Sequence, residues 1–199
     1  MAKKMGIVCI TLGILCLVSA LALLMYNRWE EADSATSSQA LLEEVQQAMA
    51  QPPSPTQETT PQEQPAQPTE MATISLDGYD CIGVLSVPAL ALELPVLTDW
   101  SYSKLKKAPC LYYGSYYQGD FVIAAHNYKS HFGRLAELQS GDVVIFTDVL
   151  GEEHRYEVVL LETLPKEATM EMITSGFDLS LYTCTPGGAN RVTVRCKSK

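Results

Sequence analysis

The hydrophobic pattern begins with a long apolar run near the N-terminus. Residues 6–25 are 20 consecutive residues without a charged side chain. A helix of about 20 apolar residues matches the ~30 Å hydrocarbon core of a bilayer. Lys3 and Lys4 precede the run, whereas acidic residues follow it closely at positions 30, 31 and 33. This asymmetry predicts a cytoplasmic tail at residues 1–5, a transmembrane helix at 6–25 and an extracellular location for the rest of the chain.

A cleaved signal peptide is the alternative interpretation of this run. The run is longer than the usual hydrophobic region of a signal peptide, and residues 26–29 (YNRW) lack a small-residue cleavage site. We therefore expect a retained, single-pass anchor in the cell membrane.

Residues 26–72 have the composition of an extracellular stalk. Six of the 11 prolines lie between Pro52 and Pro68, mixed with Gln, Thr and Glu. Such a stretch cannot bury enough apolar surface to fold, and proline keeps it extended. Within the stalk, residues 38–50 have apolar side chains at helical spacing. We expect a short helix there that is solvated or only loosely packed.

From about residue 73 the pattern changes to short strands. Runs of β-branched and aromatic residues alternate with Gly, Pro, Asn or Asp. One short helix is predicted at 132–139, and residues 165–175 could contain another helical turn. Many short strands with few helices predict a mainly β domain over residues 73–199, either a barrel or a sandwich. The predicted strands cover residues 81–87, 121–125, 142–147, 156–161, 178–183 and 191–196.

The charge balance excludes one class of function. The net charge of −9 argues against a general nucleic-acid binder, because affinity for phosphates requires a basic surface. Residues 1–72 carry 3 Lys/Arg against 8 Asp/Glu, and residues 73–199 carry 11 against 15. The predicted β domain is therefore close to an ordinary soluble domain in charge.

Cysteine usage fits an extracellular domain without a zinc site. Two of the six cysteines, Cys9 and Cys16, lie in the apolar run and serve there as small apolar residues. The remaining four do not form a CxxC pair, so a structural zinc site is not predicted. One or two disulfides could form outside the cell. If Cys184 stays free, Cys81, Cys110 and Cys196 can supply at most one intramolecular bridge.

One predicted strand ends in a cysteine that is suited to chemistry. In residues 178–184 (DLSLYTC) the two leucines share one face, and Cys184 lies on the other. Six residues rich in turn formers follow, and residues 191–196 then alternate strictly. If the two strands form an antiparallel hairpin, Cys184 and Arg191 are the closing pair, with Cβ atoms about 4.5–5.5 Å apart. Arg191 could then favour a thiolate at Cys184 or stabilise an oxyanion.

Arg195 shares a strand face with Arg191 but lies four residues further along. At strand rise this is roughly 13 Å from the hairpin end, so Arg195 is not expected to reach Cys184. The alternative for both residues is an ordinary exposed hairpin with surface arginines. Exposed arginines on strands are common, and surface charge pairs contribute little to stability.

Three histidines could act as the acid or base beside Cys184. His126 ends the apolar strand 121–125 and begins a polar loop, which fits a catalytic position. His131 begins the predicted short helix, where we expect it to be exposed. His154 lies in a predicted turn between two strands, where we expect it to be solvated. The contrast among the three favours His126.

These residues give the sequence a close resemblance to the sortase family. Residues 180–184 (SLYTC) resemble the family's TLxTC motif, with Ser in the first position. Residues 121–126 (FVIAAH) resemble the strand that delivers the catalytic histidine, although Ala125 replaces the glycine that often precedes it. Arg191 lies on the following strand, as the family's essential arginine does. The resemblance covers about residues 80–197 and implies a closed β-barrel of about eight strands with one or two short helices.

The resemblance also implies an activity. Cys184 would attack the Thr carbonyl of an LPxTG-like sorting signal on a secreted surface protein and form a thioester. Arg191 would stabilise the oxyanion or hold the substrate, and His126 would protonate the leaving amine. The acceptor would be an amine from a cell-wall precursor or a pilin lysine. No metal or organic cofactor is needed; some sortases bind calcium, but no carboxylate cluster in this sequence indicates such a site.

Two segments are candidates for substrate contact, each with a simpler alternative. Residues 111–117 are rich in tyrosine and could line a groove or form ordinary strand surface and turn. Residues 162–177 correspond to a connection that helps to form the sorting-signal pocket in sortases. Their Met170, Met172 and Ile173 could equally be core residues.

Two other functions compete with the transpeptidase. A cysteine hydrolase would use the same Cys184 and His126 with water as the acceptor, and the sequence does not separate it from a transferase. A non-catalytic surface assembly module on the same barrel is expected to lack the Cys, His or Arg, whereas all three are present.

Overall fold

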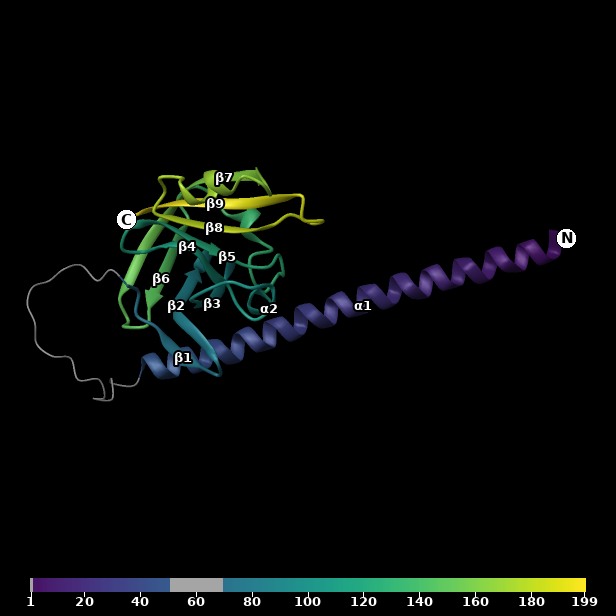
Figure 1. The fold of residues 1–199 in the computed structure, drawn as a ribbon, viewed down its shortest axis with the longest axis horizontal. Helices are drawn as coiled ribbons and strands as arrows, with labels where there is room; N and C mark the ends of the chain where they lie inside the picture. The colour runs from purple at the N-terminus through teal and green to yellow at the C-terminus, as the bar shows by residue number, and fades with distance from the viewer. Residues whose placement is uncertain (1, 51–69) are drawn as a thin grey trace, which may run out of the picture.

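The computed structural model describes residues 2–50 and 70–199, which form one long N-terminal helix and a β-barrel (Figure 1). Helix α1 spans Ala2–Met49; its N-terminal half projects away from the barrel and its C-terminal half lies against it. The projecting half is apolar and long enough to cross a membrane, and it is not buried against protein. An apolar helix surface without a protein partner is consistent with a membrane anchor.

Eight strands close into a ring, which confirms the predicted barrel. The order around the ring is β2-β3-β4-β5-β8-β9-β7-β6, and pairing between β6 and β2 closes it. Strand β1 pairs with β2 outside the ring. The strands are β1 (Ile74–Leu76), β2 (Tyr79–Val87), β3 (Leu92–Leu97), β4 (Cys110–Ser115), β5 (Gly119–Ala124), β6 (Val143–Asp148), β7 (Glu153–Pro165), β8 (Leu179–Cys184) and β9 (Asn190–Ser198).

The helical segments of the barrel domain are all short. They are η1 (Pro88–Leu90), α2 (Tyr102–Leu105), η2 (Leu135–Glu137) and α3 (Thr169–Ile173). The predicted helix at 132–139 is wrong in type, because only a 3₁₀ turn forms there and Leu138 is already extended. The apolar spacing nevertheless identified core residues, since Phe132, Leu135 and Leu138 are all buried in the barrel core. The predicted helical turn within 165–175 is α3.

The barrel interior is filled by inward-facing side chains from nearly every strand. The alternation along β8 is the clearest case: Leu179 and Leu181 enter the core as predicted. Cys196 on β9 is also fully buried in this core. Because the core occupies the interior, the site has to lie where strands end at the rim of the barrel.

A second, smaller core lies between α1 and the outside of the barrel. Leu41, Leu42 and Val45 of α1 are buried there with a set of barrel residues: Cys81, Val84, Leu97, Ala108 and Cys110. The expectation of a solvated or loosely packed helix at 38–50 is therefore wrong. The outer face of β2–β4 is apolar, and the helix removes it from water. The proline-rich part of the predicted stalk, residues 51–69, lies outside the described residues.

Candidate active site

The β8–β9 hairpin brings Cys184 and Arg191 together in the predicted register. The two residues are direct partners at the loop end of the antiparallel pair. The connection is held by hydrogen bonds between Thr185 and Asn190, including a 3.0 Å bond from the Thr185 amide to the Asn190 carbonyl. Gly187 and Gly188 both have positive φ, which a residue with a Cβ rarely adopts. The tight loop thus fixes the spacing between the two side chains.

His126 reaches the same end of the barrel from β5, which runs parallel to β8. Ala124 pairs with Tyr182, and the Ala125 amide donates to the Tyr182 carbonyl at 3.2 Å. The Thr183 hydroxyl donates to the Ala125 carbonyl at 2.8 Å in a buried hydrogen bond. These bonds tie together the residues that directly precede His126 and Cys184. Two strands that are far apart in sequence therefore deliver the histidine and the cysteine side by side.

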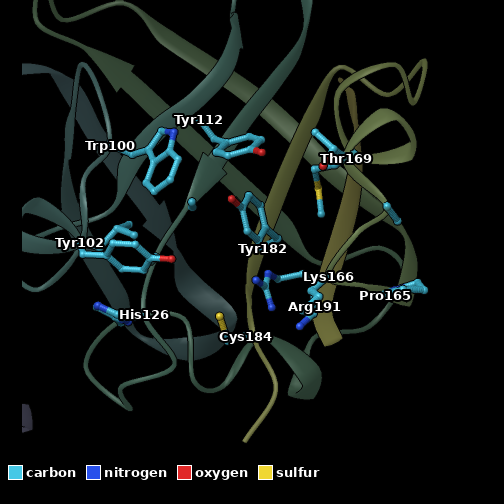
Figure 2. A pocket seen from close by; sticks show the side chains of 15 residues that line it. Trp100, Tyr102, Tyr112, His126, Pro165, Lys166, Thr169, Tyr182, Cys184 and Arg191 are labelled. Atoms are coloured by element: carbon cyan, nitrogen blue, oxygen red, sulfur yellow. The ribbon is translucent and has the colours of Figure 1, made fainter. Parts of the chain in front are cut away.

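Cys184, His126 and Arg191 all line one pocket (Figure 2). Figure 2 shows Cys184 beneath Tyr182, with His126 on one side and Arg191 on the other. Cys184 is half-buried, whereas Cys81, Cys110 and Cys196 are buried. The structure therefore gathers the three predicted site residues around a single opening.

The other three cysteines of the domain are unsuited to nucleophilic chemistry. All six cysteines of the chain are free in the described structure. Burial raises the pKa of Cys81 to about 11 and the pKa values of Cys110 and Cys196 to about 12. A thiol with such a pKa is almost entirely protonated at neutral pH and is a weak nucleophile.

The Arg191 guanidinium is anchored on one side and available on the other. Its Nη1 donates to the carbonyls of Gly188 and Asn190, each at 3.1 Å. Within residues 2–50 and 70–199, no hydrogen bond uses its Nε or Nη2. A guanidinium has five N–H donors in a fixed fork, so the remaining donors can serve a substrate oxygen.

The imidazole of His126 is half-buried and lacks a partner at one nitrogen. Its Nε2 is buried without a hydrogen bond to any described residue. Desolvation lowers the pKa of His126 below its ordinary value, while Glu30 acts to raise it and Lys106 to lower it. The neutral imidazole is thus favoured until a charged or polar partner enters the pocket.

Arg195 plays a different part from Arg191, and its environment corrects the interpretation as a surface arginine. It is buried, pairs with Ser180 and forms an ion pair with Glu162 at 2.7 Å. Further bonds run to the Ser180 hydroxyl and to the carbonyls of Glu171 and Met172. Arg195 therefore holds α3 against the barrel, and it does not line the Cys184 pocket.

The predictions for the other two histidines were wrong. His131 is fully buried, because the loop 126–133 folds back on itself and packs under α1. Burial lowers the pKa of His131 to about 4. His154 lies in β7 and not in a turn, and its ring packs on Tyr116 and Phe146. Neither residue lines the Cys184 pocket.

Aromatic side chains form one wall of the pocket. Tyr112 and Tyr182 meet edge to face at 5.2 Å, and Trp100 packs on Tyr112 at 5.8 Å and on Tyr102 at 6.0 Å. Within the predicted Tyr-rich segment only Tyr112 lines this pocket, while Tyr113 is largely exposed. Trp100 and Tyr102 were missed by the sequence analysis. The available signal was the occurrence of two aromatic residues within three positions of an otherwise polar stretch, which could have indicated a pocket wall.

The opposite wall comes from the connection between β7 and β8. Met172 is buried and lines the pocket, whereas Met170 is exposed. Met172 is thus both a core residue and part of the pocket wall, as the two interpretations of residues 162–177 proposed. The other lining residues from this connection are Pro165, Lys166, Ala168 and Thr169.

One group of side chains in the described structure has the spacing of metal ligands. Asp148, Glu152 and His154 offer ligand atoms within 4.8 Å of one another at the turn between β6 and β7. One oxygen of Asp148 already accepts the amides of Leu150 and Glu152, which caps the turn. None of the three lines the Cys184 pocket.

Comparisons with known proteins agree with this geometry. The profile of the sortase domain family matches residues 85–199. The chain is 28% identical to sortase A of Bacillus anthracis over 123 residues, which are 58% of this chain and 57% of that protein. The chain thus spans somewhat more than half the length of that curated relative.

Solved structures show the same fold. Sortase C1 from Streptococcus agalactiae superposes with a TM-score of 0.55 at 26% identity, over 63% of this chain and 70% of the other. Sortase A from Corynebacterium diphtheriae superposes with a TM-score of 0.55 at 22% identity, over 61% of each chain. Since the matched profile covers more than half of the chain and includes Cys184, His126 and Arg191, the chain belongs to the sortase family.

Proposed function

We propose that this protein is a membrane-anchored transpeptidase that cleaves an LPxTG-like sorting signal and transfers the acyl group to an amine. The observation that carries the proposal is the shared pocket of Cys184, His126 and Arg191, in which Cys184 is the accessible thiol. Membership of a family of cysteine transpeptidases supports it. The catalytic domain is proposed to lie outside the cell, with residues 1–5 in the cytoplasm.

In the first step the Cys184 thiolate attacks the carbonyl carbon of the signal's Thr. The carbonyl oxygen becomes an oxyanion, and the unused donors of Arg191 are proposed to bind it. His126 as imidazolium then donates a proton to the leaving amine as the peptide bond breaks. The products of this step are a thioester on Cys184 and a free N-terminus on the departing segment.

In the second step an amine attacks the thioester. Neutral His126 accepts the proton from the attacking amine, and Cys184 leaves as a thiolate. The acceptor is proposed to be an amine of a cell-wall precursor or a pilin lysine. An apolar wall of aromatic rings beside Cys184 favours this outcome, because it limits the access of water to the thioester.

The pocket walls suggest how the signal binds. The Leu and Pro of the signal are apolar and match Met172 and Ala168 on the β7–β8 side. The aromatic side, with Trp100 and Tyr112, is then left for the acceptor. This division gives the two substrates separate approaches to one sulfur atom.

A quenched sorting-signal peptide tests the proposal directly. The full chain in lipid nanodiscs is incubated with a panel of LPxTG-type peptides, with and without an added amine. Cleavage together with an amine-linked product, and a thioester on Cys184 trapped by mass spectrometry, is expected. Cleavage without any amine-linked product would favour the hydrolase, and the absence of both cleavage and thioester would contradict both enzymes.

A further inference from the structure

Helix α1 contacts the barrel at a second place besides its apolar patch. Ser34 is buried, and its hydroxyl donates to the Lys106 carbonyl at 2.5 Å. The same hydroxyl lies 3.4 Å from Nε2 of His131. The Glu31 carboxylate accepts the Lys129 amide at 2.8 Å. These contacts are polar; they reach the segment after α2 at Lys106 and, at Lys129 and His131, the loop that begins with His126.

Glu30 adds a charged contact to the same place. Its carboxylate pairs with the Lys106 ammonium, which follows α2. The ring of Tyr128 lies between the two histidines, 5.0 Å from His126 and 5.7 Å from His131. One helical turn, residues 30–34, thereby contacts both segments that flank the histidine side of the pocket. We call residues 30–34 the juxtamembrane turn.

The contact between the juxtamembrane turn and the barrel is made by polar side chains, although apolar side chains would attach the helix at lower cost. Burying a serine hydroxyl costs free energy unless it is hydrogen-bonded, and serine is a poorer helix former than alanine. The apolar patch at Leu41, Leu42 and Val45 already attaches the helix to the barrel. A second attachment by specific hydrogen bonds fixes the geometry of the loop more than it adds buried apolar area.

The charges around His126 come from several elements. Helix α1 supplies Glu30 and Glu31, and the segment after α2 supplies Lys106. The loop itself carries Tyr128, Lys129 and His131, and the hairpin carries Cys184 and Arg191. Of these, Glu30 raises the pKa of His126 and Lys106 lowers it. The two members of one ion pair therefore act on the imidazole in opposite directions.

We propose that the juxtamembrane turn is a working part of the active site, with Glu30 and Ser34 as positioning residues for His126. Ser34 joins the segment after α2, at Lys106, to the loop, at His131, and Glu30 contributes to the charge that the imidazole meets. This inference rests on the proposed role of His126.

The juxtamembrane turn connects the active site to the membrane anchor. Glu30 lies five residues beyond Met25, the last residue of the apolar run, which is about 7.5 Å along a continuous helix. In Figure 1 the loop between β8 and β9 lies at the end of the barrel toward which α1 runs to its N-terminus. The helix that anchors the protein is thus the helix that positions its histidine. A substrate would be cut close to the bilayer surface.

Three charge variants of the full chain in nanodiscs test Glu30: Glu30→Gln, Lys106→Gln and the control Glu43→Gln. Glu43 is exposed on the same helix, and the chemical change is identical to that at Glu30. The imidazole of His126 is titrated by NMR, and the pH–rate profile of the transfer reaction is recorded. We expect the His126 pKa to fall in Glu30→Gln and to rise in Lys106→Gln, with no change in Glu43→Gln. The same His126 pKa in all variants would overturn the proposal.

A pair of serine variants tests the positioning by hydrogen bonds. Ser38 is also buried on α1, one turn after Ser34, but its hydroxyl has no partner among the described residues. We expect Ser34→Ala to lower kcat about threefold to tenfold with KM unchanged, and Ser38→Ala to match the wild type. Equal effects on kcat would overturn the role of Ser34.

The two readouts separate this proposal from the proposed function. If the wild type transfers no peptide, the proposed function fails, while the NMR titration still decides whether Glu30 and Lys106 act on His126. If the wild type is active and the variants titrate and react like it, only the proposal on the juxtamembrane turn fails.

Discussion

Each end of the β8–β9 hairpin has one cysteine and one arginine, but the two pairs differ in burial and in hydrogen bonding. At the loop end Cys184 is half-buried, and Arg191 has hydrogen-bond donors without a partner in the described structure. Toward the other end Cys196 is fully buried, and Arg195 donates to Glu162, Ser180 and the α3 backbone. At one end polar groups lack hydrogen-bond partners in the described structure, and at the other end the arginine is hydrogen-bonded to its neighbours.

Under the proposed function, this contrast separates the part of the hairpin that does chemistry from the part that supports the fold. Guanidinium donors without a protein partner and an accessible thiol remain available to a substrate. A buried arginine with a full set of acceptors has nothing left to offer a ligand. The comparison therefore supports the proposed catalytic roles of Cys184 and Arg191 and indicates a role in the packing of the fold for Cys196 and Arg195. Substitutions at these residues test the comparison.

The largest difference is expected between the two cysteines. Cys184→Ala should reduce peptide transfer by roughly a thousandfold or more, because it removes the nucleophile, while the Tm stays near the wild-type value. Cys196→Ala should retain most of the activity and lose about 1 kcal/mol of stability, since it leaves a small gap in the core. Initial rates and thermal melts of both variants check this. Equal loss of activity would contradict the assignment of Cys184.

Replacing Arg191 by lysine keeps the charge and removes the planar fork. We expect Arg191→Lys to lower kcat about 100- to 1000-fold, as for the loss of an oxyanion donor, because one ammonium cannot hold the loop carbonyls and a substrate oxygen together. The Tm should change little, since the bonds of Arg191 reach only part-exposed carbonyls. Near-normal turnover would contradict the role of Arg191 in catalysis.

Arg195 should behave in the reverse way. Arg195→Ala is expected to cost about 3 kcal/mol of unfolding free energy, the lower end for a broken buried pair because Glu162 stays partly in water. Arg155→Ala is the matched control, since its ion pair with Glu153 is exposed and contributes little. Urea melts of both variants give the comparison. Equal stabilities would mean that Arg195 does not hold α3 in place.

The mainly β class and the centre of the site could be predicted from local pattern, whereas the choice of a closed barrel over a sandwich came from the resemblance to sortases. Strand alternation gave the core face of β8, and a six-residue turn between two strands gave the pairing of Cys184 with Arg191. His126 was found because a polar residue directly follows an apolar strand. Each inference needs only the period of a strand and the length of a loop.

The surroundings of the site could not be predicted, since they depend on which surfaces meet. His131 and Arg195 are polar residues that become buried only after a distant segment covers them, α1 in one case and α3 in the other. The helix at 38–50 looks amphipathic and weak by itself. Its partner, the outer face of β2–β4, is visible only once the barrel has closed.

The smallest expected effect concerns the hydrogen bond between the segments that precede Cys184 and His126. Thr183→Val removes the hydroxyl that donates to the Ala125 carbonyl and leaves that carbonyl buried without this donor, which should cost about 1–2 kcal/mol. Thr193→Val on β9 is the matched control, because its buried hydroxyl has no hydrogen-bond partner among the described residues. The control should be neutral or slightly stabilising in a thermal melt.

Activity decides whether this bond also positions the site. Thr183 precedes Cys184, and Ala125 precedes His126, so loosening the bond should change the distance between the sulfur and the imidazole. We expect Thr183→Val to lower kcat about threefold to tenfold with little change in KM, because misplaced reacting groups slow the chemical step more than binding. If Thr183→Val and Thr193→Val turn over equally fast at a temperature where both are folded, the bond stabilises the barrel without orienting the pair. The alignment of Cys184 with His126 would then come from the backbone pairing of β5 and β8 alone.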